Sequence, residues 1–302
     1  MALNLRTFKT RTITAILFAA IMLTGLLWNH WSFLVLFSII HFGCWWEYFN
    51  LLERIHSATG GTVYHRYTRF GFMLIGYALM LWFCGPAYQI DNYSLKGNLS
   101  FPVSIAGFVF LVLGIFQKNK INLKGFGAAA LGLIYISLCW GLMIDLRSSG
   151  KTYDIHLHDT MYVIAWGFLP IVIVASIWIN DTMAYIVGSL MGKTPLSKIS
   201  PKKTWEGTIG GIILCVALLY LLWNRLISGR SDIILDIFIA IIAFIVAVVG
   251  TIGDLFESKL KRMAAVKDSG SFMPGHGGFL DRFDSLLFAV PAVWLFIFFF
   301  AH

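Results

Sequence analysis

Two aspartate-bearing segments near the C-terminus have the residue types needed to hold a divalent cation beside a phosphate. Asp254, Ser258 and Lys261 are spaced at i, i+4 and i+7, which places a carboxylate, a hydroxyl and an ammonium on one helix face. Asp281 and Asp284, at i and i+3, share a face of the next helix. Mg²⁺ takes oxygen ligands, usually one or two carboxylates with substrate phosphates and water. We therefore predict that Asp254 and Asp281 bind Mg²⁺.

A glycine-rich turn separates these two segments. It reads Met-Pro-Gly-His-Gly-Gly over residues 273–278, and backbone N–H groups in such a turn can approach phosphate oxygens closely. His276 could contact phosphate, orient a ligand or satisfy the turn itself. Isolated basic residues here could form an interfacial rim against lipid headgroups, but a rim needs no glycine-rich turn between two aspartates. The basic side chains that could balance a polyphosphate are Lys261, Arg262, Lys267 and Arg282.

A second polar segment precedes the first along the chain. Asn180 and Asp181 could recognise a nucleobase or a ribose, and Lys202 and Lys203 could receive phosphates. The stretch 188–194 superficially looks like a phosphate-binding P-loop. Its glycines are separated by one residue too few and no strand precedes it, so we reject that interpretation.

Membrane helices must position these residues. Of the 302 residues 58% are hydrophobic and only 13% are charged, whereas an average soluble domain is about 25% charged. Continuous apolar runs long enough to cross a bilayer recur from end to end. The predicted fold class is all-α, a polytopic integral membrane protein with about nine transmembrane helices. We place them at about 12–29, 32–52, 70–90, 101–117, 125–144, 161–179, 207–224, 233–253 and 283–301.

The basic residues indicate an orientation. With the N-terminus cytoplasmic, most of the 23 Lys and Arg residues fall on one side, and the positive-inside rule makes that side cytoplasmic. Loops facing anionic lipid also account for the net charge of +8, so we expect no nucleic-acid partner. Glu47, near the inner end of the second helix, is interpreted as structural. We divide the chain into residues 1–150, scaffold helices that form no independent domain, and residues 151–302, a transmembrane catalytic region.

The run from residue 258 to residue 284, here called the signature segment, resembles the signature of phosphatidate cytidylyltransferases, also called CDP-diacylglycerol synthases. The segments 180–182 and 200–207 are similar to other recurring blocks of that family. The resemblance is strong from about residue 175 to 285 and only topological before that, and Met273 stands where another large aliphatic residue or Phe is usual. The matching positions are Ser258-x-Leu260-Lys261-Arg262, Lys267-Asp268 and Pro274-x-His276-Gly277-Gly278-Phe279-x-Asp281-Arg282-Phe283-Asp284.

The resemblance implies transfer of CMP from CTP to phosphatidic acid, which forms CDP-diacylglycerol and pyrophosphate in phospholipid biosynthesis and requires Mg²⁺. It carries the family's metal-binding aspartates onto Asp254 and Asp281, and it places Ser258 and Lys261 beside the metal and phosphate. It also implies a homodimer in a lipid bilayer of the bacterial inner-membrane type, with the active site facing the cytoplasm. A monovalent cation such as K⁺ beside the Mg²⁺ is compatible with it.

The chemistry of this reaction agrees with the residue types. The lipid phosphate is itself the nucleophile, so metal and cationic side chains need only reduce repulsion between two anions and stabilise the departing pyrophosphate. A CTP-dependent kinase of a polyprenol-type lipid alcohol and an ether-lipid cytidylyltransferase are alternatives of the same general class. A transporter is the alternative from another class, but transporters place ionisable groups near the bilayer midplane, and here they gather at its boundary.

Overall fold

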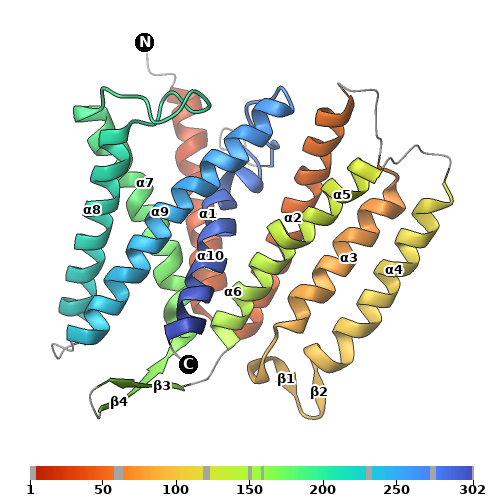
Figure 1. The fold of residues 1–302 in the computed structure, drawn as a ribbon, viewed down its shortest axis with the longest axis horizontal. Coiled ribbons are helices and arrows are strands. Elements are labelled where there is room, and N and C mark those ends of the chain that lie inside the picture. Colours follow the sequence, from red (N-terminus) through yellow and green to blue (C-terminus); the bar gives the residue numbers. More distant parts are fainter. Residues whose placement is uncertain are drawn as a thin grey trace. The chain divides into compact units, whose positions relative to one another are not determined.

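The computed structural model describes residues 5–57, 64–117, 123–148, 152–157, 160–228, 233–272 and 277–300, and most of them are helical (Figure 1). A nearly all-α fold is therefore confirmed. The chain forms two compact units. Unit 1 contains Met1–Gly150 and Leu260–Phe283, and unit 2 contains Lys151–Lys259 and Asp284–His302. Most of the signature segment consequently belongs to unit 1.

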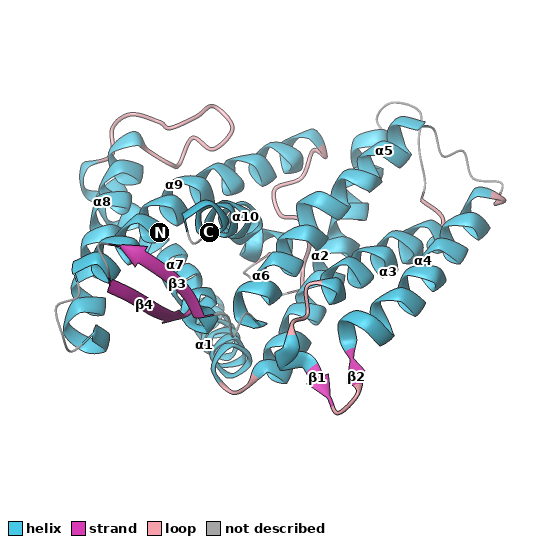
Figure 2. Cartoon of the chain, turned by 60° about the horizontal axis from the view of Figure 1, so that its bottom comes forward, coloured by secondary structure: helices cyan, strands magenta, loops and turns pink. Residues whose placement is uncertain are grey.

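Unit 1 is a group of helices joined by short connections. Two small β-strands, β1 (Gln89–Ile90) and β2 (Tyr93–Ser94), form an antiparallel hairpin between the third and fourth helices (Figure 2). π-Helical turns at Leu95–Leu99 and Leu133–Leu138 interrupt the regular helices. The helices are α1 (Leu5–Leu27), α2 (His30–Ser57), α3 (Arg66–Trp82), α4 (Ser100–Ile115), α5 (Leu123–Gly132) and α6 (Cys139–Ser148).

Helix α2 supplies much of the core of unit 1. Its side chains Phe37, Trp45 and Phe49 are fully buried. Trp45 Nε1 donates a hydrogen bond of 2.8 Å to Ser137 Oγ, and His41 Nε2 lies 3.0 Å from the same hydroxyl. Buried polar groups need such partners because no water reaches them. Helix α2 is therefore fixed both by aromatic packing and by a polar contact with the π-helical turn.

Unit 2 begins with a β-hairpin and continues as helices. Helices α7 and α8 approach closely at Gly207, where an added Cβ would lie only 2.8 Å from the carbonyl oxygen of Ala184. Small residues at such contacts are the usual means of packing helices in a membrane. The elements are β3 (Thr152–Leu157), β4 (Thr160–Ala165), a 3₁₀ turn (Trp166–Phe168), α7 (Leu169–Met191), α8 (Trp205–Leu222), a π-helical turn (Trp223–Ser228), α9 (Ile233–Met263) and α10 (Leu280–Phe300).

The helix predicted at 161–179 is wrong in its first half. Strands β3 and β4 pair in an antiparallel hairpin, and α7 begins only at Leu169 and runs on to Met191. A short apolar run does not by itself distinguish a strand from a buried helix, and Tyr162, Val163 and Ile164 are residue types that favour strands. Asp181 consequently lies within α7 rather than after its end.

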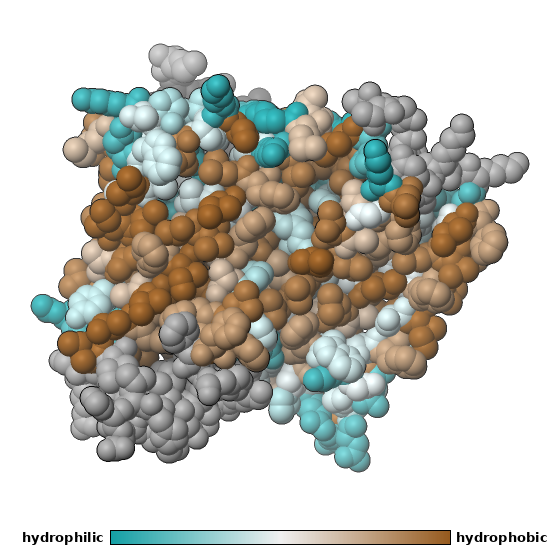
Figure 3. Space-filling view, viewed as in Figure 1, coloured by the Kyte–Doolittle hydropathy of each residue, from teal (hydrophilic) through white to brown (hydrophobic). Residues whose placement is uncertain are grey.

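Seven helical segments in the described part of the chain are long and apolar enough to cross a membrane. The apolar part of α1, Thr12–Leu27, and helix α3 are shorter, so the count of nine stays a prediction, as does the orientation. Hydrophobic side chains such as Ile213, Ile237 and Phe244 are exposed on α8 and α9. Hydrophobic residues cover a wide part of the surface in the view of Figure 3. Exposed apolar faces of this kind are typical of helices that contact lipid. The seven segments are His30–His56, Leu95–Ile115, Leu123–Ser148, Leu169–Met191, Trp205–Arg225, Leu235–Met263 and Leu280–Phe299.

Candidate active site

The segment between α7 and α8 is an ordered turn that presents two lysines. Lys203 accepts a hydrogen bond of 2.7 Å at its carbonyl oxygen from the backbone N–H of Leu196. Glu206, in the first turn of α8, accepts from the backbone N–H groups of Lys193 and Thr194, each at 3.2 Å. The turn is therefore tied both to itself and to the start of α8, which restricts where its lysines lie.

A cavity of about 410 Å³ lies in unit 2 beside this turn. Asn180 and Asp181 of α7 line it together with Lys202 and Lys203. Asn180 is only 6% exposed, and its Oδ1 atom has no hydrogen-bond donor among the described residues. A buried amide oxygen of this kind is suited to accept a hydrogen bond from a ligand. The four residues predicted to bind nucleotide thus share one cavity, although their role in binding stays a prediction.

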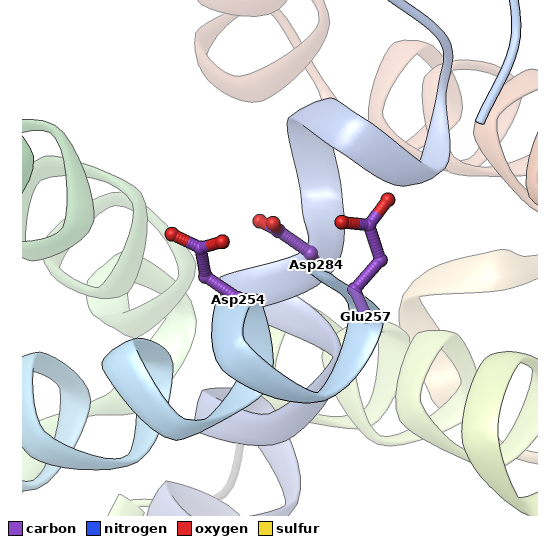
Figure 4. Close-up of side chains that lie close together, drawn as sticks. All are labelled: Asp254, Glu257 and Asp284. Carbon is purple, nitrogen blue, oxygen red and sulfur yellow. The ribbon is translucent and has the colours of Figure 1, made fainter. Parts of the chain in front are cut away.

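Three carboxylates converge in unit 2 (Figure 4). Asp254 and Glu257 project from α9 and Asp284 from α10, and each offers an oxygen within 4.8 Å of the other two. Glu257 is fully buried and Asp284 is 9% exposed. Lys203 forms an ion pair with Asp254 through Oδ2, and Ser258 Oγ donates to Asp254 Oδ1 at 3.3 Å.

This carboxylate cluster (Asp254, Glu257 and Asp284) favours binding of a cation. Two like charges about 5 Å apart repel by roughly 3 kcal/mol at an effective dielectric constant of 20. Lys203 pairs with Asp254, one of the three carboxylates. Carboxylate oxygens are hard donors of the type that Mg²⁺ prefers. The donor set of the cluster therefore fits a magnesium ion.

Asp281 lies in a different network, within unit 1. Its Oδ1 atom accepts a hydrogen bond of 2.6 Å from Lys261 Nζ. Its Oδ2 atom accepts from the backbone N–H groups of Ser269 and Gly278, each at 2.8 Å. The side chains of Lys261 and Asp281 are 13% and 9% exposed. Asp281 is therefore held by donors from α9, from the loop that follows it and from the glycine-rich turn.

The predicted metal and phosphate residues divide between the two units. Asp254 and Ser258 contact each other in unit 2, and Lys261 and Asp281 contact each other in unit 1. The helical spacing predicted that Asp254 and Ser258 share a face, whereas it made no prediction of a contact between Lys261 and Asp281. A single ion shared by Asp254 and Asp281 stays a prediction.

The remaining predicted residues have simpler surroundings. Arg262 donates through Nη1 to the carbonyl oxygen of Val266 at 3.4 Å, which turns it toward the end of α9. Lys267 and Arg282 are exposed, and their role in substrate binding stays a prediction. His276 lies outside the described residues.

Two functional candidates were not assigned from the sequence. Glu257 follows Asp254 by three positions on the same helix, so the spacing that linked Asp281 with Asp284 could also have identified it. Glu47 was interpreted as structural, yet its carboxylate accepts a hydrogen bond of 2.7 Å from Ser269, 222 positions later. Nothing in the local sequence around Glu47 could predict that contact.

Comparison with known proteins assigns the chain to a family. Residues 9–300 match the profile of the cytidylyltransferase family. A phosphatidate cytidylyltransferase of Bacillus subtilis is 34% identical over 223 residues, which cover 73% of this chain and 76% of the relative. One of Staphylococcus epidermidis is 37% identical over 203 residues, covering 67% and 68% of the two chains.

A plant relative is longer. The chloroplastic phosphatidate cytidylyltransferase 4 of Arabidopsis thaliana is 33% identical over 211 residues, which are 67% of this chain and 53% of the relative. The chain thus spans about half the length of that protein, whereas it spans about three quarters of the Bacillus relative. Because the profile match extends over nearly all of the sequence, the chain belongs to the cytidylyltransferase family.

Proposed function

We propose that this chain is a phosphatidate cytidylyltransferase, which transfers CMP from CTP to phosphatidic acid and releases pyrophosphate. The observation that carries the proposal is the match to the cytidylyltransferase family over residues 9–300, with bacterial and plant relatives that bear this name. The lysine-lined cavity in unit 2 supports it, because the same unit contains the carboxylate cluster, and Lys203 contributes to both.

The reaction can be written with these side chains. A phosphate oxygen of phosphatidic acid attacks the α-phosphorus of CTP, the bond from that phosphorus to the bridging oxygen of the β-phosphate breaks, and pyrophosphate leaves with that electron pair. Lys202 and Lys203 bind the phosphates of CTP and lower the repulsion between the two anionic substrates. Asn180 Oδ1 accepts a hydrogen bond from the nucleoside. No general base is required because the attacking phosphate is already ionised.

Magnesium is the proposed cofactor. Asp254, Glu257 and Asp284 would hold it in unit 2, and Asp281 remains a predicted ligand. When bound, Mg²⁺ neutralises negative charge that develops on the phosphates. A monovalent cation such as K⁺ beside it remains part of the proposal.

The proposed setting is the cytoplasmic (inner) membrane. CTP dissolves in the cytosol and phosphatidic acid lies in the leaflet, so an active site at the cytoplasmic boundary can receive both. We propose nine transmembrane helices, a cytoplasmic N-terminus and a homodimer. The seven candidate spans and the basic residues of the loops support the membrane assignment.

Labelled CTP tests the reaction. Purified protein incubated with phosphatidic acid, Mg²⁺ and CTP labelled in the base should transfer that label to extracted lipid. CTP labelled in the γ-phosphate should instead deliver its label to pyrophosphate. A lipid that carries only the γ label would identify a kinase and refute the transferase.

A further inference from the structure

The three residues before helix α10 offer no side chain that could cap it. The helix starts at Leu280, and the residues before it are Gly277, Gly278 and Phe279, none of which has a side-chain acceptor. The first backbone N–H groups of a helix need partners from elsewhere in such a case. Here the N–H of Phe279 donates to Glu47 Oε1 at 2.9 Å, and that of Leu280 donates to Glu47 Oε2 at 3.0 Å.

Glu47 projects from α2 toward the start of α10, and its carboxylate packs closely against the surrounding backbone. The residue is 5% exposed. A Cβ added to Gly270 or to Gly278 would overlap its carboxylate, so both glycines are needed for this close approach. Burying a carboxylate is costly unless donors surround it, and the positive end of a helix adds a favourable field. The site therefore surrounds the Glu47 carboxylate with hydrogen-bond donors.

Ser269 connects Glu47 with Asp281. Its hydroxyl oxygen lies 2.7 Å from Glu47 Oε2 and 3.0 Å from Asp281 Oδ2. A hydroxyl has one proton, so Ser269 donates to one of these two carboxylates at a time. The same oxygen lies 3.3 Å from the backbone N–H of Asp281 and accepts from it. Any displacement of Glu47 is consequently transmitted to Asp281, whose other carboxylate oxygen is paired with Lys261.

We propose that Glu47 is a positioning residue of the active site. It fixes the start of α10 and the loop around Ser269, and thereby the orientation of Asp281 and Lys261. Glu47 itself binds neither substrate nor metal. The inference concerns catalysis only if the proposed cytidylyltransferase function holds, but the hydrogen bonds on which it rests can be tested without it.

Glu47→Gln is the first test, because glutamine keeps the size of the side chain and removes its charge. An amide NH₂ group would then face backbone N–H donors. We expect turnover in the presence of CTP, phosphatidic acid and Mg²⁺ to fall about 10- to 100-fold, as for loss of a group that orients a metal ligand. We also expect the variant to require more Mg²⁺. Hydrogen–deuterium exchange of the peptide containing Phe279 and Leu280 should become faster.

Glu53→Gln is the matched control. Glu53 lies on the same helix, but it pairs with Arg69 at 2.5 Å and accepts from the backbone N–H of Tyr64 at 2.9 Å. This variant should retain the turnover and Mg²⁺ requirement of the wild type. Ser269→Ala is a second test should Glu47→Gln not fold, since it removes the hydroxyl that joins Glu47 to Asp281 and leaves the backbone donors of Phe279 and Leu280 on Glu47. It should raise the Mg²⁺ requirement in the same direction.

Two results would overturn the proposal. One is a folded Glu47→Gln variant with wild-type turnover and Mg²⁺ requirement. The other is lowered activity with unchanged exchange at Phe279 and Leu280, because that would dissociate Glu47 from the start of α10. Failure of the wild type to form any cytidylylated lipid would refute the proposed function instead, and the exchange measurement would still report on Glu47.

Discussion

At the residue scale, the Asp254 carboxylate lies between a positive charge and two further carboxylates. Lys203 pairs with Oδ2 and Ser258 donates to Oδ1, while Glu257 and Asp284 bring negative charge within 4.8 Å. A cation bound by the cluster would compete with Lys203 for the Asp254 carboxylate. We therefore expect the lysine to release Asp254 when the ion binds and to become available to a substrate phosphate, which would couple metal binding to substrate binding.

Glu257→Gln tests the carboxylate cluster. The change removes one buried negative charge without altering the size of the side chain, so it weakens attraction for a cation and relieves repulsion within the cluster. Initial rates measured against Mg²⁺ concentration should show a requirement raised about 10-fold or more, while thermal stability without Mg²⁺ should be equal to or higher than that of the wild type. Asp91→Asn is the control, because Asp91 is exposed in the β1–β2 turn at φ 49°. An unchanged Mg²⁺ requirement in Glu257→Gln would exclude it as a ligand.

At the element scale, the ends of helices position the candidate site residues. These ends were the features hardest to predict from the sequence. The turn after α9 is an example. Helix α9 ends at Met263, the backbone N–H of Val266 donates to the carbonyl oxygen of Lys261 at 2.9 Å, and Ala265 has φ 54°. This left-handed conformation is usually occupied by glycine. It starts the loop that leads to Ser269, yet the sequence at this point contains no glycine to mark it.

Ala265→Gly should therefore stabilise the protein. A residue with a side chain is destabilised by roughly 1 kcal/mol or more in this conformation. Glycine avoids this strain, but its greater freedom in the unfolded chain offsets part of the stabilisation. We expect a net stabilisation of about 0.5 kcal/mol, detected as a higher midpoint of thermal unfolding in detergent. Ala264→Gly should instead be destabilising because Ala264 is 6% exposed and loses a buried methyl group. Equal shifts in both variants would contradict the argument.

Contacts between residues close in the sequence were easier to predict than contacts between distant ones. Helical spacing predicted that Asp254 and Ser258 share a face, and they are hydrogen-bonded. Lys261 and Asp281 lie on different helices, so only their residue types drew attention to them. The hairpin of β3 and β4 was missed because its apolar run is too short for periodicity to distinguish strand from helix. The partners of Glu47 were not predicted because they lie more than two hundred residues away, and only folding brings them together.

At the scale of the whole molecule, the two proposed substrates come from different phases. CTP is a polyanion that does not cross a bilayer, and phosphatidic acid remains in one. In the proposed topology most of the basic residues lie on one side, which the positive-inside rule makes cytoplasmic. Lys202 and Lys203, which line the cavity of unit 2, are among them. Charge distribution and substrate supply therefore predict the same side for the site.

Sealed vesicles of known sidedness test this arrangement. In inverted membrane vesicles the cytoplasmic face is outward, so added CTP should reach the site and label phosphatidic acid at once. In right-side-out vesicles the same CTP should give little product until a detergent or a pore-forming agent lets it enter, and the rate should then approach that of inverted vesicles. Lys202→Ala removes one lysine from the cavity lining and should weaken phosphate binding without changing orientation. The rate should therefore fall by the same factor in inverted vesicles and in right-side-out vesicles that have been opened to CTP. Immediate labelling in right-side-out vesicles alone would place the lysines of the cavity on the external face and reverse the predicted topology.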